Sequence, residues 1–223
     1  MLSRVKRKSV KNLTLYPVIL RVPQSIRLLR GRPKFQALGR HARQSLRISG
    51  QRSGFYPEKL LKGKSGEPLS CGGVHWSISH KTNFVAGIVS LEPAGIDIER
   101  VKPVTQGVFE KIVTLEEVAC FGNCDYLDLF FRVFTAKEAL LKLRGVGLAG
   151  LSGVKVVGAP EANLTLVQYQ GDVSTVEHFW VDGHICSVVR KEADLVWDCV
   201  NPFPITIQES LKNGHPGNCR FKK

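Results

Sequence analysis

The sequence predicts an α+β protein of two similar α/β lobes, and three observations support this class. With 223 residues, 43% of them hydrophobic, the chain can bury a substantial core. Each half contains a helical pattern followed by several short runs with strand-like composition. Gly, Pro and Asp separate these runs, as turns require. No apolar stretch approaches the roughly 18 residues of a membrane-spanning helix, so we expect a soluble protein.

The first half begins with a basic amphipathic helix at residues 34–48, where apolar side chains recur at helical spacing with arginines between them. Residues 50–68, rich in Gly, Ser, Lys and Pro, indicate a loop. Three strands follow, over residues 74–79, 84–91 and 95–99. In the last strand, Ile96 and Ile98 point to one side while Asp97 and Glu99 point to the other.

The second half is predicted to contain helical residues 108–119, a stronger helix at 125–144, and then four strands. The glycines at 145 and 147 end the stronger helix. The four strands are expected at residues 153–157, 163–169, 176–181 and 184–190. We therefore expect four segments: a basic, partly flexible N-terminal segment (1–33), a first lobe (34–98), a second lobe (99–205) and a C-terminal tail (206–223).

The formal net charge of +13 is concentrated near the N-terminus. Fourteen Lys and Arg lie between Arg4 and Arg52, and no acidic residue precedes Glu58. Such a block favours a polyanionic partner: nucleic acid, membrane lipid, a phosphorylated cofactor or an acidic protein surface. A solvated basic tail or an organelle transit peptide would have the same composition.

The six cysteines form no C-x-x-C pair, which argues against a disulfide framework and favours a reducing cytoplasm. Cys120 and Cys124 lie one helical turn apart. No Cys/His pair follows them at zinc-finger spacing, so a zinc site is not expected.

Asp97 and Glu99 are the first pair of residues that could carry chemistry. Carboxylates on one face of a strand, about 7 Å apart, offer hard oxygen ligands. One or two carboxylates plus substrate phosphates commonly hold Mg²⁺. A solvent-facing strand edge would show the same D-x-E pattern, so the pair alone does not establish a site.

The second element is FTAKEALLK, residues 134–142, in which Glu138 and Lys142 share one helical face. On its own this pattern is typical of a surface ion pair worth a few tenths of a kcal/mol. Near the carboxylates of the strand, the same two side chains could hold a metal and a metal-bound phosphate.

Together with WSISHK at 76–81 and GIDIE at 95–99, this segment resembles the surfactin-type (Sfp-like) 4′-phosphopantetheinyl transferases. The family pattern is G-[IV]-D-x-E, followed about forty residues later by an aromatic, two positions, and K-E-[AS]-x-x-K. The GVGL run at 145–148 and the segment at 38–46 also agree with the family. The resemblance covers roughly residues 34–190.

The resemblance implies an enzyme that transfers the phosphopantetheine arm of coenzyme A to a serine of an apo carrier protein. It also implies a fold with pseudo-twofold symmetry, a cleft between the lobes, a monomer and an acidic carrier as partner. The metal ligands implied for Mg²⁺, with Mn²⁺ as an alternative, are Asp97, Glu99 and Glu138. The implied catalytic residues are Glu138, which is also the candidate base, Lys142 and Asp97. The implied coenzyme A contacts are Ser79, His80, Lys142, Lys64, Lys34 and Arg43.

The sequence departs from the family before the S-x-S-H segment, where a G-K-P element is usual. The chain has either Gly66-Glu67-Pro68, with the wrong charge, or Gly63-Lys64-Ser65, without the proline; we favour Lys64 as the substitute. The role of Lys137 stays open between neutralising the site and facing solvent. The alternatives are a catalytically silent relative that binds coenzyme A and a basic nucleic-acid-binding module, which would show steeply salt-dependent binding.

Overall fold

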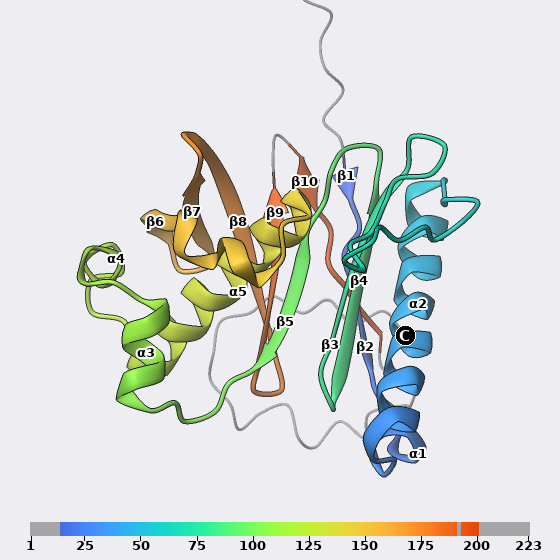
Figure 1. Cartoon of the computed structure of the whole chain (residues 1–223), viewed down its shortest axis with the longest axis horizontal. Helices are drawn as coiled ribbons and strands as arrows, with labels where there is room; N and C mark the ends of the chain where they lie inside the picture. The colour runs from blue at the N-terminus through green and yellow to red at the C-terminus, as the bar shows by residue number, and fades with distance from the viewer. Residues whose placement is uncertain (1–13, 191–192, 201–223) are drawn as a thin grey trace, which may run out of the picture.

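The computed structural model describes residues 14–190 and 193–200, and it confirms a mixed α+β fold (Figure 1). Two main sheets, of four and five strands, stand side by side with long helices packed on them, and a separate sheet has two strands. The elements of the first half are β1 (Thr14–Leu15), β2 (Val18–Arg21), α1 (Gln24–Arg27), α2 (Gly31–Ser53), β3 (His75–His80), β4 (Phe84–Ser90) and β5 (Ile96–Arg100). Those of the second half are α3 (Gln106–Ile112), α4 (Leu115–Ala119), α5 (Tyr126–Arg144), η1 (Leu148–Gly153), β6 (Val154–Glu161), β7 (Leu164–Tyr169), β8 (Asp172–Val181), β9 (His184–Arg190), β10 (Asp194–Leu195) and β11 (Asp198–Val200).

The smaller of the two main sheets has the strand order β11-β2-β4-β3, and α2 covers its outer face (Figure 1). The separate two-stranded sheet pairs β1 with β10. The helix buries the apolar stripe that its sequence predicted, including Leu38, Ala42 and Leu46. Gly87 of β4 permits a close approach, because a Cβ there would overlap the Ser45 hydroxyl and lie 3.1 Å from the Leu46 nitrogen. The helix therefore rests directly on the sheet.

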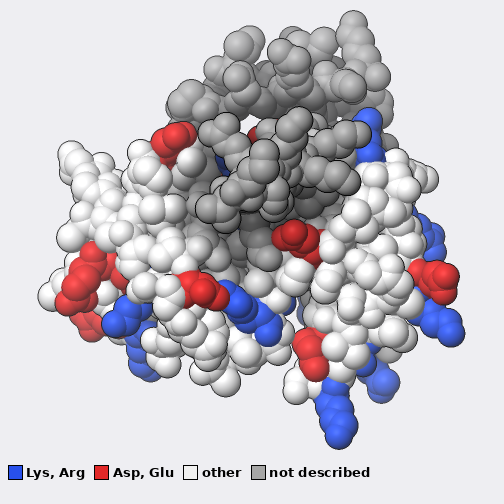
Figure 2. Space-filling model, turned by 90° about the horizontal axis from the view of Figure 1, so that it is seen from above, with Lys and Arg blue, Asp and Glu red and all other residues white. Residues whose placement is uncertain are grey.

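The basic residues of α2 point away from this contact. Seen from above, Lys and Arg side chains project from the side of the molecule that α2 occupies (Figure 2). No acidic residue lies between residues 14 and 57. This side of the protein therefore carries positive charge.

The larger sheet is antiparallel, with the order β5-β9-β8-β7-β6. Helix α5 packs across it, and α3 and α4 lie at its outer end (Figure 1). Asp125 caps the start of α5 by accepting hydrogen bonds from the backbone nitrogens of the first turn. Gly145 ends the helix with φ +68°, a conformation that favours glycine. Both ends agree with the predicted helix at 125–144.

The two sheets meet at β5. Its Ile96 and Ile98 are fully buried and pack with Phe84 and Ile88 of the smaller sheet and Cys186 of β9. The predicted boundary at residue 98 falls inside this strand, which pairs with β9 of the larger sheet. At the other end of the chain, β11 pairs with β2 of the smaller sheet. The segment boundaries remain predictions, and residues 1–13 and 201–223 lie outside the described part.

The helix predicted at 108–119 is wrong in one respect, because the structure contains two helices there. The backbone of Val113 is extended, and Thr114 starts a new helix. The Thr114 hydroxyl accepts from the Glu117 nitrogen while the Glu117 carboxylate accepts from the Thr114 nitrogen. This reciprocal cap favours a helix start over continuation of the preceding helix.

The described part of the N-terminal segment is folded, and Ile19 of β2 is fully buried. Within residues 14–190 and 193–200, no helix combines the length and the apolar character needed to cross a membrane.

A buried polar network lies inside the larger sheet. The His178 ring is hydrogen-bonded to the Ser187 hydroxyl (2.7 Å) and the Thr165 hydroxyl (2.8 Å). Ser187 also shares a 2.6 Å hydrogen bond with Thr135 of α5. Burial, with a smaller contribution from the Arg132 charge, lowers the pKa of His178 well below its usual value. The ring is therefore neutral in the folded protein.

Candidate functional site

Asp97, in the middle of β5, is the centre of the candidate site. Its side chain is only 2% exposed. One carboxylate oxygen, Oδ1, accepts from the Ser79 hydroxyl (2.8 Å) and from the Lys142 ammonium (2.7 Å). The other oxygen, Oδ2, is buried and has no hydrogen-bond partner among the described residues. A buried carboxylate oxygen is costly without a donor or a cation, so this oxygen is a candidate ligand position.

Gly95 explains how α5 reaches Asp97. A Cβ at Gly95 would overlap the Ala139 carbonyl oxygen and lie 2.8 Å from the Leu143 nitrogen, so only glycine lets the helix backbone rest on the start of β5. Because α5 lies directly on β5 here, the Lys142 ammonium bonds both Asp97 and the Ile96 carbonyl oxygen, the latter at 3.1 Å. The glycine of GIDIE and the last lysine of KEALLK are therefore parts of one contact.

Ser77 and Ser79 join β3 to β5. The Ser77 hydroxyl accepts from the Ile96 nitrogen at 3.2 Å, while the Ser79 hydroxyl donates to Asp97. Ser79 was predicted to contact coenzyme A, and the structure places its hydroxyl on the Asp97 carboxylate. The S-x-S spacing fits this arrangement, because residues two apart on a strand face the same side.

Glu99 lies two residues beyond Asp97 and forms an ion pair with Lys81, with 2.5 Å between Oε1 and Nζ. Burial raises the pKa of Glu99; the Lys81 hydrogen bond opposes this and the Asp97 charge adds to it. Burial alone would lower the pKa of Lys81, but the hydrogen bond to Glu99 outweighs it and the pKa is raised. Sequence reasoning missed Lys81, although it directly follows the S-x-S-H segment.

Glu138 lies on α5, one turn before Lys142. Burial raises the pKa of Glu138 to about 7, and the charge of Asp97 contributes in the same direction. The charges of Lys142 and Lys81 oppose this rise, while that of Glu99 adds to it. The charges of Asp97 and Glu99 thus both act on Glu138, as expected of neighbouring carboxylates.

His80 ends β3 beside this cluster. Its ring packs edge-on against Phe35 of α2, with 5.3 Å between the ring centroids. Burial and the Lys142 charge lower the pKa of His80, and the Lys62 charge contributes in the same direction. A neutral imidazole carries one N–H donor and one acceptor nitrogen.

The remaining residues predicted to contact coenzyme A are Lys34, Arg43 and Lys64, and two of them bond to backbone carbonyl oxygens nearby. Lys34 donates to the Arg27 carbonyl oxygen (3.0 Å), and Arg43 donates to the Gly39 carbonyl oxygen one helical turn earlier (3.2 Å). Lys64 is exposed in the loop after α2. Among the described residues, none of the three has a recorded bond to the Asp97 cluster. Their roles remain predictions.

Glu67 carries a negative charge where the resemblance led us to expect a lysine, and its carboxylate contacts the backbone of its own loop. Its carboxylate accepts from the Ser65 nitrogen at 3.0 Å and would collide with a Cβ at Gly63. The negative charge of Glu67 is therefore partly directed to the backbone.

Lys137 has a structural role that the sequence left open. Its ammonium is buried, donates to the Ile112 carbonyl oxygen at 2.7 Å, and pairs with Glu117 at 2.8 Å. Glu117 also accepts from the nitrogens of Thr114 and Val156. The pair therefore ties α5 to α4, the end of α3 and β6, and fixes the helix that carries Glu138.

The donor chemistry at Asp97, Glu99 and Glu138 fits a hard divalent cation, since the three carboxylates share one partly buried cluster and Asp97 Oδ2 lacks a partner. Within residues 14–190 and 193–200, however, no three His, Cys, Asp or Glu side chains already converge as a metal-binding set. The ammonium groups of Lys142 and Lys81 lie against two of the carboxylates in this arrangement.

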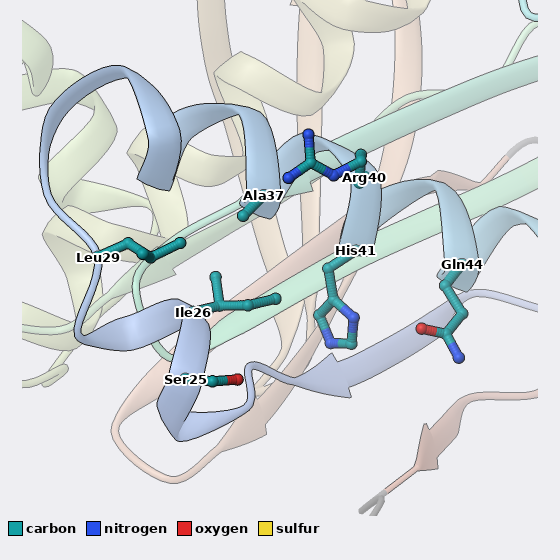
Figure 3. Close-up of a pocket in the computed structure, with 7 residues that line it drawn as sticks. All are labelled: Ser25, Ile26, Leu29, Ala37, Arg40, His41 and Gln44. Atoms are coloured by element: carbon teal, nitrogen blue, oxygen red, sulfur yellow. The ribbon is translucent and has the colours of Figure 1, made fainter.

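A separate hollow of about 410 Å³ lies between α1 and α2 (Figure 3). Its lining comes from α1, from the turn after it and from one face of α2: Ser25, Ile26, Leu29, Ala37, Arg40, His41 and Gln44. The hollow shares no residue with the Asp97 cluster. The candidate site is therefore defined by the side-chain cluster at β5, not by this hollow.

Comparison with known proteins confirms the resemblance to Sfp-like transferases. Residues 93–189 match the model of the 4′-phosphopantetheinyl transferase superfamily. The chain is similar to 4′-phosphopantetheinyl transferase ffp of Bacillus subtilis, with 31% identity over 78 residues that cover 34% of this chain and 35% of the relative. It is 32% identical to 4′-phosphopantetheinyl transferase psf-1 of Bacillus pumilus over 104 residues, 41% of each chain. Identity to 4′-phosphopantetheinyl transferase Sfp of Bacillus subtilis is 28% over 78 residues, 34% of this chain and 35% of the relative.

The chain spans only about a third to two fifths of the length of these relatives. The match to the family model contains Asp97, Glu99, Glu138 and Lys142, whereas His80 precedes it.

Proposed function

We propose that this chain transfers the 4′-phosphopantetheine arm of coenzyme A to a serine of an apo carrier protein, releasing adenosine 3′,5′-bisphosphate. The observation that carries the proposal is the 2.7 Å contact between Asp97 of GIDIE and Lys142 of KEALLK. Two motifs that lie 45 residues apart in the sequence meet in one buried cluster. The names of the similar proteins support the same activity.

In this reaction the serine oxygen attacks the β-phosphorus of coenzyme A, and the bond to the bridging oxygen breaks. Charge on the leaving bisphosphate must be neutralised, and the two oxygens must lie in line. Lys142 supplies a fixed positive charge, and the neutral His80 ring can donate one hydrogen bond to a phosphate oxygen. Ser79 orients Asp97 through its hydroxyl. We propose Glu138 as the base that takes the serine proton.

Mg²⁺ would be held by Asp97, Glu99 and Glu138, with Mn²⁺ as an alternative. Bound there with the diphosphate, the cation would neutralise developing charge on the phosphate oxygens. For this arrangement, Lys81 must release Glu99, whereas Lys142 can keep its bond to Asp97 Oδ1 and leave Oδ2 to the cation. The Lys81 side chain is 39% exposed, so its ammonium can exchange Glu99 for an anionic ligand.

The proposed function includes an arrangement of two related lobes, an oligomeric state and a carrier of defined charge. We propose that the two sheets with their helices are lobes related by a pseudo-twofold axis. The close approach of α2 to Gly87 and of α5 to Gly95 supports this, because each sheet receives its helix over a glycine. We also propose a monomer that acts in the cytoplasm on an acidic carrier, which the positive side around α2 would attract.

Intact-mass spectrometry tests the proposal. A panel of apo acyl carrier proteins and peptidyl carrier domains is incubated with the protein, coenzyme A and Mg²⁺. The expected result is a gain of one phosphopantetheine arm on at least one carrier, abolished by a chelator. If coenzyme A binds but no carrier gains mass, the chain is a silent relative. If coenzyme A does not bind and nucleic acid does, the nucleic-acid alternative takes its place.

A further inference from the structure

Four exposed apolar side chains lie in two segments next to the site-bearing elements β3 and α5. Leu61 and Leu69 belong to the loop before β3, and Val146 and Leu148 follow α5 directly. Each is between 42% and 61% exposed. We call this set the rim patch. Exposed apolar side chains that gather beside a functional site commonly mark a contact surface.

The first loop is a small, anchored hairpin. The Leu69 nitrogen donates to the Leu61 carbonyl oxygen (3.0 Å), and the Gly63 nitrogen donates to the Glu67 carbonyl oxygen (2.9 Å). The Trp76 indole of β3 donates to the Leu69 carbonyl oxygen at 3.1 Å. The two leucines are therefore held opposite each other, close to the strand that carries Ser79 and His80.

The hairpin also reaches the end of α5. A Cβ placed on Gly145 would lie 3.8 Å from the side chain of Glu67. Val146 follows that glycine, and its nitrogen bonds the Leu141 carbonyl oxygen (3.2 Å), which fixes the turn. Lys142, which contacts Asp97, lies one turn before Val146. Both halves of the rim patch thus lie near the end of α5, about one turn beyond Lys142.

The charge around the rim patch is positive. Lys62 and Lys64 project from the hairpin and are exposed. Lys62 is close enough to His80 for its charge to lower the pKa of that ring. The carboxylate of Glu67 is directed to the Ser65 nitrogen. An apolar patch flanked by lysines favours a protein surface that combines apolar side chains with carboxylates.

We propose that the rim patch docks the carrier protein, with apolar side chains near the acceptor serine packing on the four exposed residues and carboxylates pairing with the flanking lysines. This inference rests on the proposed transfer reaction. A serine that attacks a phosphate beside Lys142 and His80 brings its own surroundings against the loops that border these residues. Those loops are the hairpin at 61–69 and the turn at 145–148.

Binding is measured separately from chemistry. The probes are an acyl carrier protein and a peptidyl carrier domain, each with its acceptor serine replaced by alanine, titrated calorimetrically into the protein. The test variant is Leu69→Ser combined with Leu148→Ser. The matched control is Leu115→Ser, which removes an apolar side chain that is 86% exposed on α4. Coenzyme A affinity and thermal stability are measured for each variant.

The expected result is that the double variant weakens carrier binding about tenfold or more, as loss of central apolar contacts does at interfaces. Coenzyme A affinity is expected to be unchanged, and the control is expected to match wild type. Weakened carrier binding without arm transfer by wild type would support docking and refute the proposed reaction. Arm transfer by wild type, together with unchanged carrier binding in the double variant, would support the proposed reaction and refute the docking.

Two further outcomes would also overturn the docking proposal. One is that neither carrier binds the wild-type protein. The other is that the double variant loses thermal stability while its carrier affinity is unchanged, which would mean that the chain itself covers the rim patch.

Discussion

Gly95→Ala is the sharpest test of how the site is assembled. The added methyl group would overlap the Ala139 carbonyl oxygen and lie 2.8 Å from the Leu143 nitrogen and 3.0 Å from the Ala139 carbonyl carbon. All three are backbone atoms of α5, so no side chain can rotate to make room. Overpacking typically costs about 1–3 kcal/mol, and we expect about 3 kcal/mol here because a helix must move. That movement would also separate Lys142 from Asp97.

Urea unfolding, followed by tryptophan fluorescence, measures the free energy, and calorimetry measures coenzyme A affinity. The matched control is Gly107→Ala in α3, where a Cβ meets nothing within 4 Å. Replacing an exposed helical glycine by alanine is expected to stabilise by about 0.5–1 kcal/mol. If Gly95→Ala were as stable as the control and bound coenzyme A normally, the close contact between β5 and α5 would not exist as described.

Two further predictions concern buried groups away from the reacting atoms. Lys137→Met should lower the free energy of unfolding in urea by about 3 kcal/mol, because it leaves the buried Glu117 carboxylate without its cation. The control Lys111→Met changes an exposed residue of α3 and should stay within about 0.5 kcal/mol of wild type. Equal effects of the two substitutions would contradict a buried pair. Burial and Arg132 hold the pKa of His178 below its unfolded value, so the unfolded chain binds the proton first. The stability from His178 is complete above about pH 6.5 and is lost as pH falls, by at most about 1.4 kcal/mol per pH unit. The slope of unfolding free energy between pH 7.5 and 5 should be smaller in His178→Gln, and an identical slope would refute this assignment.

Local signals predicted α5 well. Its sequence combines a capping aspartate, a long apolar pattern and a glycine at the end, and these agree with one another. The strands at β3, β4, β5 and β9 were predicted for the same reason, since alternation and turn residues agree. The break at Val113 was missed, because the cap at Thr114 and Glu117 competes with a helical pattern that continues through it.

The site was only partly predictable. Asp97, Glu138 and Lys142 were identified from motifs, but their spatial relation depends on contacts between distant segments. Ser79 was predicted to bind a phosphate, and its hydroxyl proved to bond Asp97. Lys81 had no periodic signal, because its role depends on the turn between β3 and β4 placing it against Glu99.

The residues of the KEALLK motif have two roles: Glu138 and Lys142 belong to the candidate site, and Lys137 anchors the helix. Lys142 contacts Asp97 of β5 and Glu138 feels the Asp97 charge, while Lys137 points in another direction and is buried against Glu117. Residues at adjacent helical positions point about 100° apart, so one short motif can both anchor the helix and present its chemistry. Sequence alone could not separate these roles, because both require lysine.

Single-turnover arm transfer, with saturating coenzyme A and Mg²⁺, tests the central claim most directly. The variants are Asp97→Asn and Lys142→Met, with Lys111→Met as the control. If the cluster stabilises charge during transfer, each site variant should slow the reaction by about 10²–10³-fold while the control matches wild type. Rates within about threefold of wild type in both site variants would contradict the claim that transfer occurs at Asp97 and Lys142.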